Sequence, residues 1–167
     1  MVNKHTLLLV DDEINVLRSL KRLFDEEDYI VLTAENAEEG LKILEQTPVD
    51  LIISDQKMPG MSGLEFLEKT MPGYPDVIRI ILTGQAELDM AIEAINKGCV
   101  YKFILKPWNN YDLLFTVKRA LEQYSLIRDN RDLTNELKKQ DAILQELEKQ
   151  HPGITKRPKD GIYRISQ

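Results

Sequence analysis

The first 122 residues alternate between two hydrophobic patterns, and this alternation restricts the fold more than any other feature of the chain. Short runs of consecutive apolar residues predict buried strands. Longer segments with an apolar residue at every third or fourth position predict amphipathic helices. The predicted strands are Thr6–Val10, Tyr29–Thr33, Leu51–Ser54, Val77–Leu82 and Val100–Leu105.

A predicted helix follows each of these strands. The helices begin near Ile14, Ala37, Leu64, Leu88 and Asn110. Five strands that alternate with five helices indicate an α/β fold with a parallel sheet. Nearly continuous apolar strands indicate that helices cover both faces of the sheet. Ligands of such sheets bind outside the carboxyl ends of the strands, so the residues that follow each strand are the candidates for a site.

Polar residues of a consistent kind stand at these strand ends. Asp11 and Asp12 follow the first strand, Asp55 the third, Thr83 the fourth and Lys106 the fifth. In a parallel sheet these positions meet at one edge. Clustered carboxylates need a counter-charge to stay ionised. Mg²⁺ prefers one or two carboxylates together with water and phosphate oxygens, so the residues predict a magnesium site.

Such a site suits the transfer of a phosphoryl group to a carboxylate. Asp55 is the candidate nucleophile, and the metal with Lys106 neutralises charge on the transferring group. Thr83 can hydrogen-bond a phosphoryl oxygen only after the transfer. Each residue also has a simpler explanation: Asp11 or Asp12 can cap the first helix, and Thr83 can belong to an ordinary turn. The combination at one edge favours the metal site.

At these residues the sequence resembles the receiver domain of bacterial two-component response regulators. The resemblance covers residues 5–122 and includes four motifs in order. They are LLLVDDE at 7–13, LIISDQKMPGMSGLEFL at 51–67, ILTG at 81–84 and KFILKPW at 102–108. It implies a flavodoxin-like (βα)5 doubly wound sheet with the strand order 2-1-3-4-5.

The resemblance also assigns roles to single residues. Asp55 would be the phosphoacceptor and would receive its phosphoryl group from a histidine kinase. Asp12 would bind Mg²⁺ directly and Asp11 mainly through water, together with Asp55 and the backbone carbonyl of Lys57. Thr83 and Lys106 would contact the phosphoryl group.

The aromatic switch position of the family is occupied by Phe103, where a tyrosine is common. Phenylalanine can still rotate inward but has no hydroxyl, so a signal carried by a hydroxyl is not expected. Tyr101 lies two positions earlier, and Trp108 follows the lysine-proline pair. An exposed aromatic residue beside a switching face can anchor a partner protein, and packing against the last helix is the simpler explanation for Trp108.

The last helix is predicted to continue beyond the receiver domain, through residues 123–151. Apolar and polar residues alternate there by four and three, which is typical of a coiled-coil seam. The seam positions are Leu126, Asn130, Leu133, Leu137, Gln140, Leu144, Leu147 and His151. A homodimer through this helix is therefore expected, and a lone solvated helix is the simpler alternative. Residues 152–167 are expected to form a disordered tail, a short edge strand at 162–165 or the truncated beginning of a further element.

Charge and composition exclude several classes of function. Residues 1–122 carry 13 basic and 21 acidic side chains, so this part is a poor binder of nucleic acids. No apolar run approaches the roughly 20 residues that span a bilayer, and the N-terminus lacks the pattern of a signal peptide. We therefore expect a cytoplasmic protein without direct contact to membranes. With a single cysteine, Cys99, an internal disulfide is excluded and a zinc site is not expected.

The sequence therefore predicts a response regulator that signals without being an enzyme and acts on a downstream protein that these residues do not identify. Two alternatives are an inert scaffold that acts through its coiled coil and a phosphatase that works through an aspartyl-phosphate. Phosphatases of the haloacid-dehalogenase type place a second acid two residues after the nucleophile. Lys57 stands there, which argues against a phosphatase.

Overall fold

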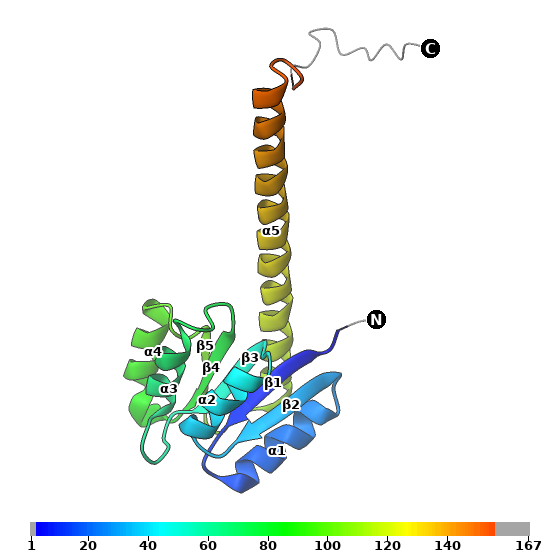
Figure 1. Ribbon diagram of the computed structural model, residues 1–167. Coiled ribbons are helices and arrows are strands. Elements are labelled where there is room, and N and C mark those ends of the chain that lie inside the picture. The colour runs from blue at the N-terminus through cyan, green and yellow to red at the C-terminus, as the bar shows by residue number, and fades with distance from the viewer. Residues whose placement is uncertain (1–2, 156–167) are drawn as a thin grey trace. The chain divides into compact units, whose positions relative to one another are not determined.

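Five parallel strands form one sheet in the computed structural model of this protein, which describes residues 3–155. The order in the sheet is β2-β1-β3-β4-β5, as the resemblance implied (Figure 1). The strands are β1 (His5–Val10), β2 (Tyr29–Ala34), β3 (Leu51–Asp55), β4 (Ile78–Thr83) and β5 (Lys102–Leu105). The strand order reverses between β1 and β3, and ligands of doubly wound sheets bind at this point.

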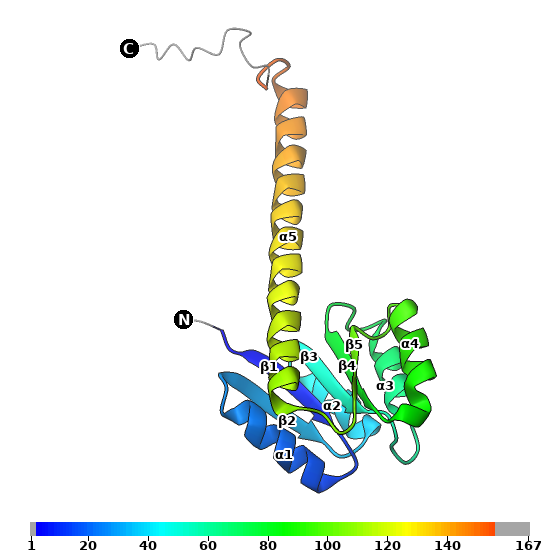
Figure 2. The ribbon, with the colours of Figure 1, turned by 180° about the vertical axis from the view of Figure 1, so that it is seen from behind.

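Helices cover both faces of the sheet. They are α1 (Ile14–Asp25), α2 (Ala37–Gln46), α3 (Gly63–Thr70), α4 (Leu88–Asn96) and α5 (Asn110–Gln150), with a short 3-10 helix, η1 (Gln85–Glu87), before α4. Buried residues of α2, α3 and α4 join one core cluster, and those of α1 and the first part of α5 join the other. Figure 2 shows α1 and the first part of α5 in front of the sheet. The sequence prediction of a doubly wound α/β fold is confirmed.

Alternation within the strands divides the two cores. In β1, Leu7 and Leu9 pack into the cluster with α1 and α5, whereas Leu8 and Val10 pack into the opposite cluster. Successive side chains of a strand point to opposite faces, so a strand between two helical layers must be apolar at every position. This requirement explains the continuous apolar runs of the central strands.

The last strand is shorter and less buried than the sequence pattern predicted. The predicted strand begins at Val100, whereas β5 begins at Lys102. Gly98 adopts a φ of +78° after α4, and the N–H of Cys99 donates to the carbonyl of Ala94. These contacts form a Schellman motif. Because the motif occupies the first residues after α4, the strand starts later in the chain. Because β5 is an edge strand, its residues are exposed or only half-buried.

The single charged residue inside β4, Arg79, is buried, and neutral oxygens hold its guanidinium group. Its guanidinium donates to the hydroxyl of Thr70 at 2.7 Å, to the carbonyl of Val77 at 2.8 Å and to the carbonyl of Tyr74. Burial lowers the pKa of Arg79. These acceptors belong to the last residue of α3 and to the loop that follows it. The arginine therefore links the end of α3 and this loop to the sheet.

The long helix α5 spans two units of the chain, which divide between Tyr124 and Ser125. In the second unit the helix ends at Gln150, close to the Pro152-Gly153 stop that the sequence predicted. The Glu148 carboxylate accepts hydrogen bonds from the N–H of Gly153 at 2.6 Å and the hydroxyl of Thr155 at 2.7 Å. The predicted strand at 162–165 lies outside the described residues. None of the helices described in residues 3–155 is long and apolar enough to cross a membrane.

Gly63, the first residue of α3, lies against the end of β3. A Cβ atom at this position would lie 2.1 Å from the carbonyl oxygen of Asp55. We expect Gly63→Ala to lower the free energy of unfolding by about 2–3 kcal/mol, because the backbone that carries Asp55 must shift. Chemical denaturation measures this change. Gly73→Ala is the matched control, since no atom lies within 4 Å of its Cβ position; an equal loss there would contradict the explanation.

Candidate functional site

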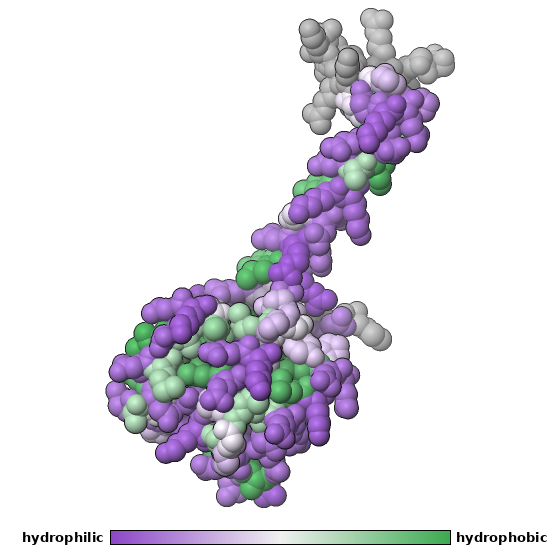
Figure 3. Space-filling model, turned by 60° about the vertical axis from the view of Figure 1, so that its left-hand side comes forward, coloured by the Kyte–Doolittle hydropathy of each residue, from purple (hydrophilic) through white to green (hydrophobic). Residues whose placement is uncertain are grey.

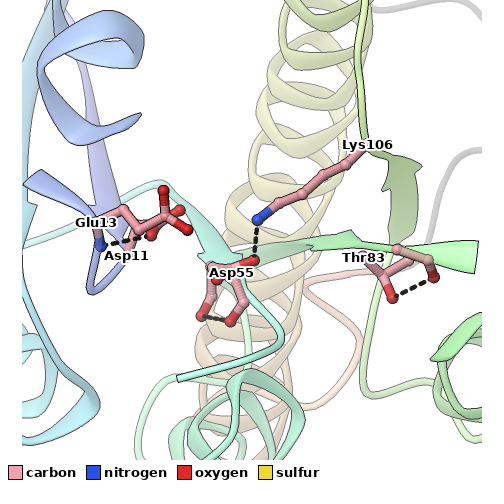
Figure 4. Close-up of polar contacts among 7 residues, drawn as sticks. Asp11, Glu13, Asp55, Thr83 and Lys106 are labelled. Atoms are coloured by element: carbon pink, nitrogen blue, oxygen red, sulfur yellow. Dashed lines mark hydrogen bonds and ion pairs between the residues drawn. The ribbon is translucent and has the colours of Figure 1, made fainter. Parts of the chain in front are cut away.

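The carboxyl ends of β1, β3, β4 and β5 bring the predicted residues together (Figure 4). Asp11 follows β1, Asp55 ends β3, Thr83 ends β4 and Lys106 follows β5. Carboxylate oxygens of Asp11, Asp12 and Asp55 all lie within 4.8 Å of one another. Asp11 and Asp55 are buried, whereas Asp12 is exposed.

Asp11 uses only one of its two carboxylate oxygens for the local fold. Its Oδ1 accepts a hydrogen bond of 2.9 Å from the N–H of Glu13 at the start of α1. Its Oδ2 is buried and has no hydrogen-bond partner. Burial, with the nearby charges of Asp55 and Asp12, raises the pKa of Asp11 from 3.8 to about 6, against the lowering effect of the Glu13 hydrogen bond and of Lys106. The helix-capping explanation therefore accounts for one oxygen and leaves the other without a role.

Asp55 is held by an ion pair across the sheet. The Lys106 Nζ atom lies 2.5 Å from the Oδ1 of Asp55, whose side chain is 4% exposed. Although burial lowers the pKa of Lys106, its hydrogen bond to Asp55 and the negative charges of Asp55, Asp11 and Glu13 raise it above its usual value. Lys106 is therefore positively charged at neutral pH, beside the second oxygen of Asp55, which this ion pair does not use.

These residues fit a hard divalent cation. An unpartnered buried carboxylate oxygen is costly unless a proton or a cation satisfies it. Asp11, Asp12 and Asp55 together offer only oxygen donors, which Mg²⁺ prefers to nitrogen or sulfur ligands. Lys106 neutralises one carboxylate of the three, so the cluster keeps net negative charge for a cation.

Backbone hydrogen bonds fix Thr83 and the residues around it at the same edge. The N–H of Lys106 donates to the carbonyl of Thr83 at 2.9 Å, and the N–H of Gln56 donates to the carbonyl of Leu82 at 2.9 Å. The Thr83 hydroxyl is buried and donates to the carbonyl of Gly84 at 3.2 Å. Because this bond is long, the hydroxyl is available to a stronger, charged acceptor at the same edge of the sheet.

Gln56 is a supporting residue that the sequence analysis did not identify. Its side-chain Oε1 accepts a hydrogen bond of 2.9 Å from the N–H of Leu64, and its carbonyl accepts one from Gly63. These bonds close the loop between Asp55 and α3. A polar residue directly after a buried strand was the available signal, but it does not reveal a partner eight residues later in the chain.

The family model that describes the response regulator receiver domain matches residues 7–118. The chain belongs to the response regulator receiver domain family. The match covers the four motifs and the strand ends that carry the acidic cluster. Receiver domains of two-component systems act in signal transduction, and this chain has their fold and their strand-end residues.

The curated relatives of this receiver are bacterial regulators. The chain is 37% identical over 141 residues to the hydrogenase transcriptional regulatory protein HoxA of Cupriavidus necator, a match that covers 84% of this chain and 29% of that protein. It is 38% identical over 128 residues to the transcriptional regulatory protein GlrR of Escherichia coli, covering 75% of this chain and 28% of GlrR. The chain thus spans less than a third of the length of these relatives.

Solved structures show the same fold. A response regulator receiver domain protein from Clostridium thermocellum superimposes with a TM-score of 0.70 at 34% identity, covering 74% of this chain and 98% of that one. A structure titled adenylate cyclase from Rhodopirellula baltica superimposes with a TM-score of 0.76 at 33% identity, covering 80% of this chain and 98% of that one. The receiver fold is therefore supported by sequence and by structure.

The remaining predicted residues of the receiver lie around the site and not in the cluster. Lys57 stands in the loop two residues after Asp55, and its side chain is exposed. Phe103 is half-buried and packs against the core cluster that contains α4. Trp108 packs against the opposite cluster, as its simpler explanation predicted. Tyr101 is exposed, and its hydroxyl donates to the Oε1 of Gln123 at 2.9 Å.

A cavity of about 460 Å³ lies between β5 and the beginning of α5. Its lining includes Phe103 and Trp108 together with Phe115, which is 62% exposed and carries the Arg119 guanidinium over its ring at 5.6 Å. The edge strand that carries Phe103 therefore borders a hollow surface to which Trp108 and Phe115 contribute aromatic side chains.

Affinity for Mg²⁺ is expected to depend on pH through Asp11. A cation binds the ionised carboxylate, and the pKa of Asp11 is about 6 in the metal-free protein. Each pH unit below 6 should therefore weaken Mg²⁺ binding about tenfold, because the cation must displace a proton. Isothermal titration calorimetry at pH 5, 6 and 7.5 measures this change. Equal affinities at pH 5 and 7.5 would contradict the assignment of Asp11.

Proposed function

We propose that this receiver accepts a phosphoryl group on Asp55 from a histidine kinase, in a reaction that requires Mg²⁺. The observation that carries the proposal is the acidic cluster with one unpartnered buried oxygen on Asp11, beside an Asp55 that is paired with a charged lysine. A purely structural ion pair between Asp55 and Lys106 explains neither Asp11 nor Asp12.

In the proposed reaction an Asp55 carboxylate oxygen attacks the phosphorus atom of a phosphohistidine. The new O–P bond forms as the P–N bond breaks, and the electron pair of that bond returns to the imidazole nitrogen. Lys106, held 2.5 Å from Asp55, neutralises charge that collects on the transferring group. Thr83 donates its hydroxyl to a phosphoryl oxygen of the product.

Asp12, Asp11, Asp55 and the backbone carbonyl of Lys57 would hold the Mg²⁺ ion. When bound, the ion supplies positive charge that lowers the repulsion between the Asp55 carboxylate and the incoming phosphoryl oxygens. The exposure of Asp12 leaves one side of the cluster accessible to water and to the donor.

We propose that the phosphorylated domain signals by protein contact. Movement of Thr83 toward the phosphoryl group draws the loop before α4 inward and lets Phe103 turn into the space between β4 and α4. The α4-β5-α5 face, with Tyr101 and Trp108, then changes its fit to a downstream protein. The helix after residue 124 would pair with a second copy of the chain through its leucine seam. In this proposal the protein works in the cytoplasm and catalyses no turnover beyond slow loss of its own phosphoryl group.

Intact-protein mass spectrometry tests the proposal directly. With Mg²⁺ and phosphoramidate, the protein should gain one phosphoryl group, and a chelator should prevent the gain. Reduction of the acyl phosphate with borohydride converts the modified aspartate to homoserine, and peptide sequencing should locate it at position 55.

Three results would count against the proposal. Modification at another residue would remove Asp55 from its role. Continuous hydrolysis of a phosphomonoester such as p-nitrophenyl phosphate would support the phosphatase alternative. A scaffold with an inert receiver predicts no modification under any condition and the same binding partners for the wild-type protein and Asp55→Ala.

A further inference from the structure

The helix after residue 124 has a regular leucine seam. Acidic residues lie beside this seam, and basic residues lie at the outer positions of the helix. The seam leucines are exposed, from 37% at Leu147 to 65% at Leu126. Figure 3 shows separate hydrophobic residues along an otherwise hydrophilic helix. We infer that this seam forms a parallel, in-register, two-stranded coiled coil with a second copy of the chain, and that acidic residues beside the seam keep the dimer weak. The inference deepens the proposed pairing of two copies and rests on it.

Polar seam residues determine the orientation. Asn130 occupies an a position of the heptad and Gln140 a d position, so a parallel pair in register places each amide against its own copy. An antiparallel pair that keeps the leucines in contact places Asn130 against Leu147 and Gln140 against Leu137. An amide buried against leucine loses its hydrogen bonds, which reduces an association constant at least about fivefold for each residue.

The positions beside the seam carry acids and no bases. Along the seam from Asp129 to Gln150, the acidic e and g positions are Asp129, Glu136, Asp141 and Glu148. The basic residues of the same helix lie at the outer positions b, c and f: Arg128, Arg131, Lys138, Lys139 and Lys149. In a stable parallel dimer, opposite charges usually face each other from g to the following e position.

In the parallel pair, Glu136 of each copy faces Asp141 of the other. These two like-charge contacts are solvated, and each weakens association only about twofold. The four amide–leucine contacts of the antiparallel pair cost more, so the polar layers decide the orientation and the flanks decide the strength. Screening by salt should therefore strengthen the dimer, which is the opposite of the effect on a coiled coil held by ion pairs.

Disulfide trapping in the full chain tests the orientation. In a Cys99→Ser background, Leu133→Cys and Leu147→Cys should each form a cross-linked dimer in a glutathione redox buffer, because d positions face their own copies. Ala142→Cys, at an outer f position, is the control and should stay uncross-linked. In the antiparallel pair the two residues at 133 lie about 16 Å apart along the axis, too far for a disulfide.

Analytical ultracentrifugation of the protein without added cysteines tests whether the chain dimerises and whether the acidic residues beside the seam weaken the dimer. The dimer dissociation constant should fall when NaCl rises from 50 to 500 mM, and Glu136→Gln with Asp141→Asn should lower it about fourfold at 50 mM NaCl. Cross-linking only in a mixture of Leu133→Cys and Leu144→Cys proteins would establish the antiparallel pair and overturn the inference. A protein that stays monomeric at every concentration would overturn the inference that the seam pairs with a second copy, even if Asp55 is phosphorylated normally.

Discussion

Phosphoryl incorporation from phosphoramidate is expected to be more than about 100-fold lower in Asp55→Asn than in the wild-type protein. The amide keeps the shape of the buried side chain but has no nucleophilic oxygen that can form a stable acyl phosphate. It also ends the 2.5 Å ion pair with Lys106, so the lysine loses its partner at the same time. Incorporation after a fixed interval, measured by intact-protein mass spectrometry, gives the ratio to wild type.

The matched control for this variant is Asp89→Asn. Asp89 is an exposed acid in the first turn of α4, so its change removes one negative charge without touching the cluster. We expect the control to incorporate the phosphoryl group at the wild-type rate. Incorporation by Asp55→Asn at a similar rate would show that the phosphoacceptor is another residue.

Asp11→Asn is expected to change stability and metal binding in opposite directions. Because burial raises the pKa of Asp11 from 3.8 to about 6, the unfolded chain ionises this group more readily than the folded one. Its stabilising contribution is present below about pH 4 and is lost as the pH rises through 6. The neutral amide should therefore raise the free energy of unfolding of the metal-free protein by roughly 2–3 kcal/mol at pH 7.

The same substitution removes a charged ligand, so Mg²⁺ affinity should fall at least about tenfold. Asp12→Asn is the control, because Asp12 is exposed. It should weaken Mg²⁺ binding but leave the stability of the metal-free protein within about 0.5 kcal/mol of wild type. Denaturant unfolding in a chelator, at pH 4 and pH 7, separates the two effects. A stability gain of Asp11→Asn that is the same at both pH values would contradict the role of ionisation.

The local sequence predicted the class of fold and the composition of the site because both depend on patterns within single elements. Strands that are buried on both faces must be apolar throughout, and a parallel sheet brings their carboxyl ends to one edge. The sequence was therefore enough to predict the site residues Asp11, Asp55, Thr83 and Lys106. The limits of β5 could not, because the Schellman motif at Gly98 and Cys99 depends on how α4 ends.

Gly63 and Gln56 show a second limit of sequence reasoning. Each acts through a contact with a backbone that the loop brings back toward β3. The sequence shows a glycine and an amide near a turn, and many turns contain such residues. Only the folded loop shows that a side chain at position 63 would collide with the carbonyl of Asp55.

The sequence by itself predicted that the residues of a candidate phosphoacceptor site stand at the ends of parallel strands, and it contains a leucine seam with acidic flanks after the domain. Tertiary structure alone decided that Asp11 is buried with one oxygen left unpartnered and that Lys106 reaches Asp55. Burial depends on all the elements packed around a side chain. No local pattern contains this information, and the buried, unpartnered oxygen of Asp11 is what favours the predicted metal ligand over a helix cap alone.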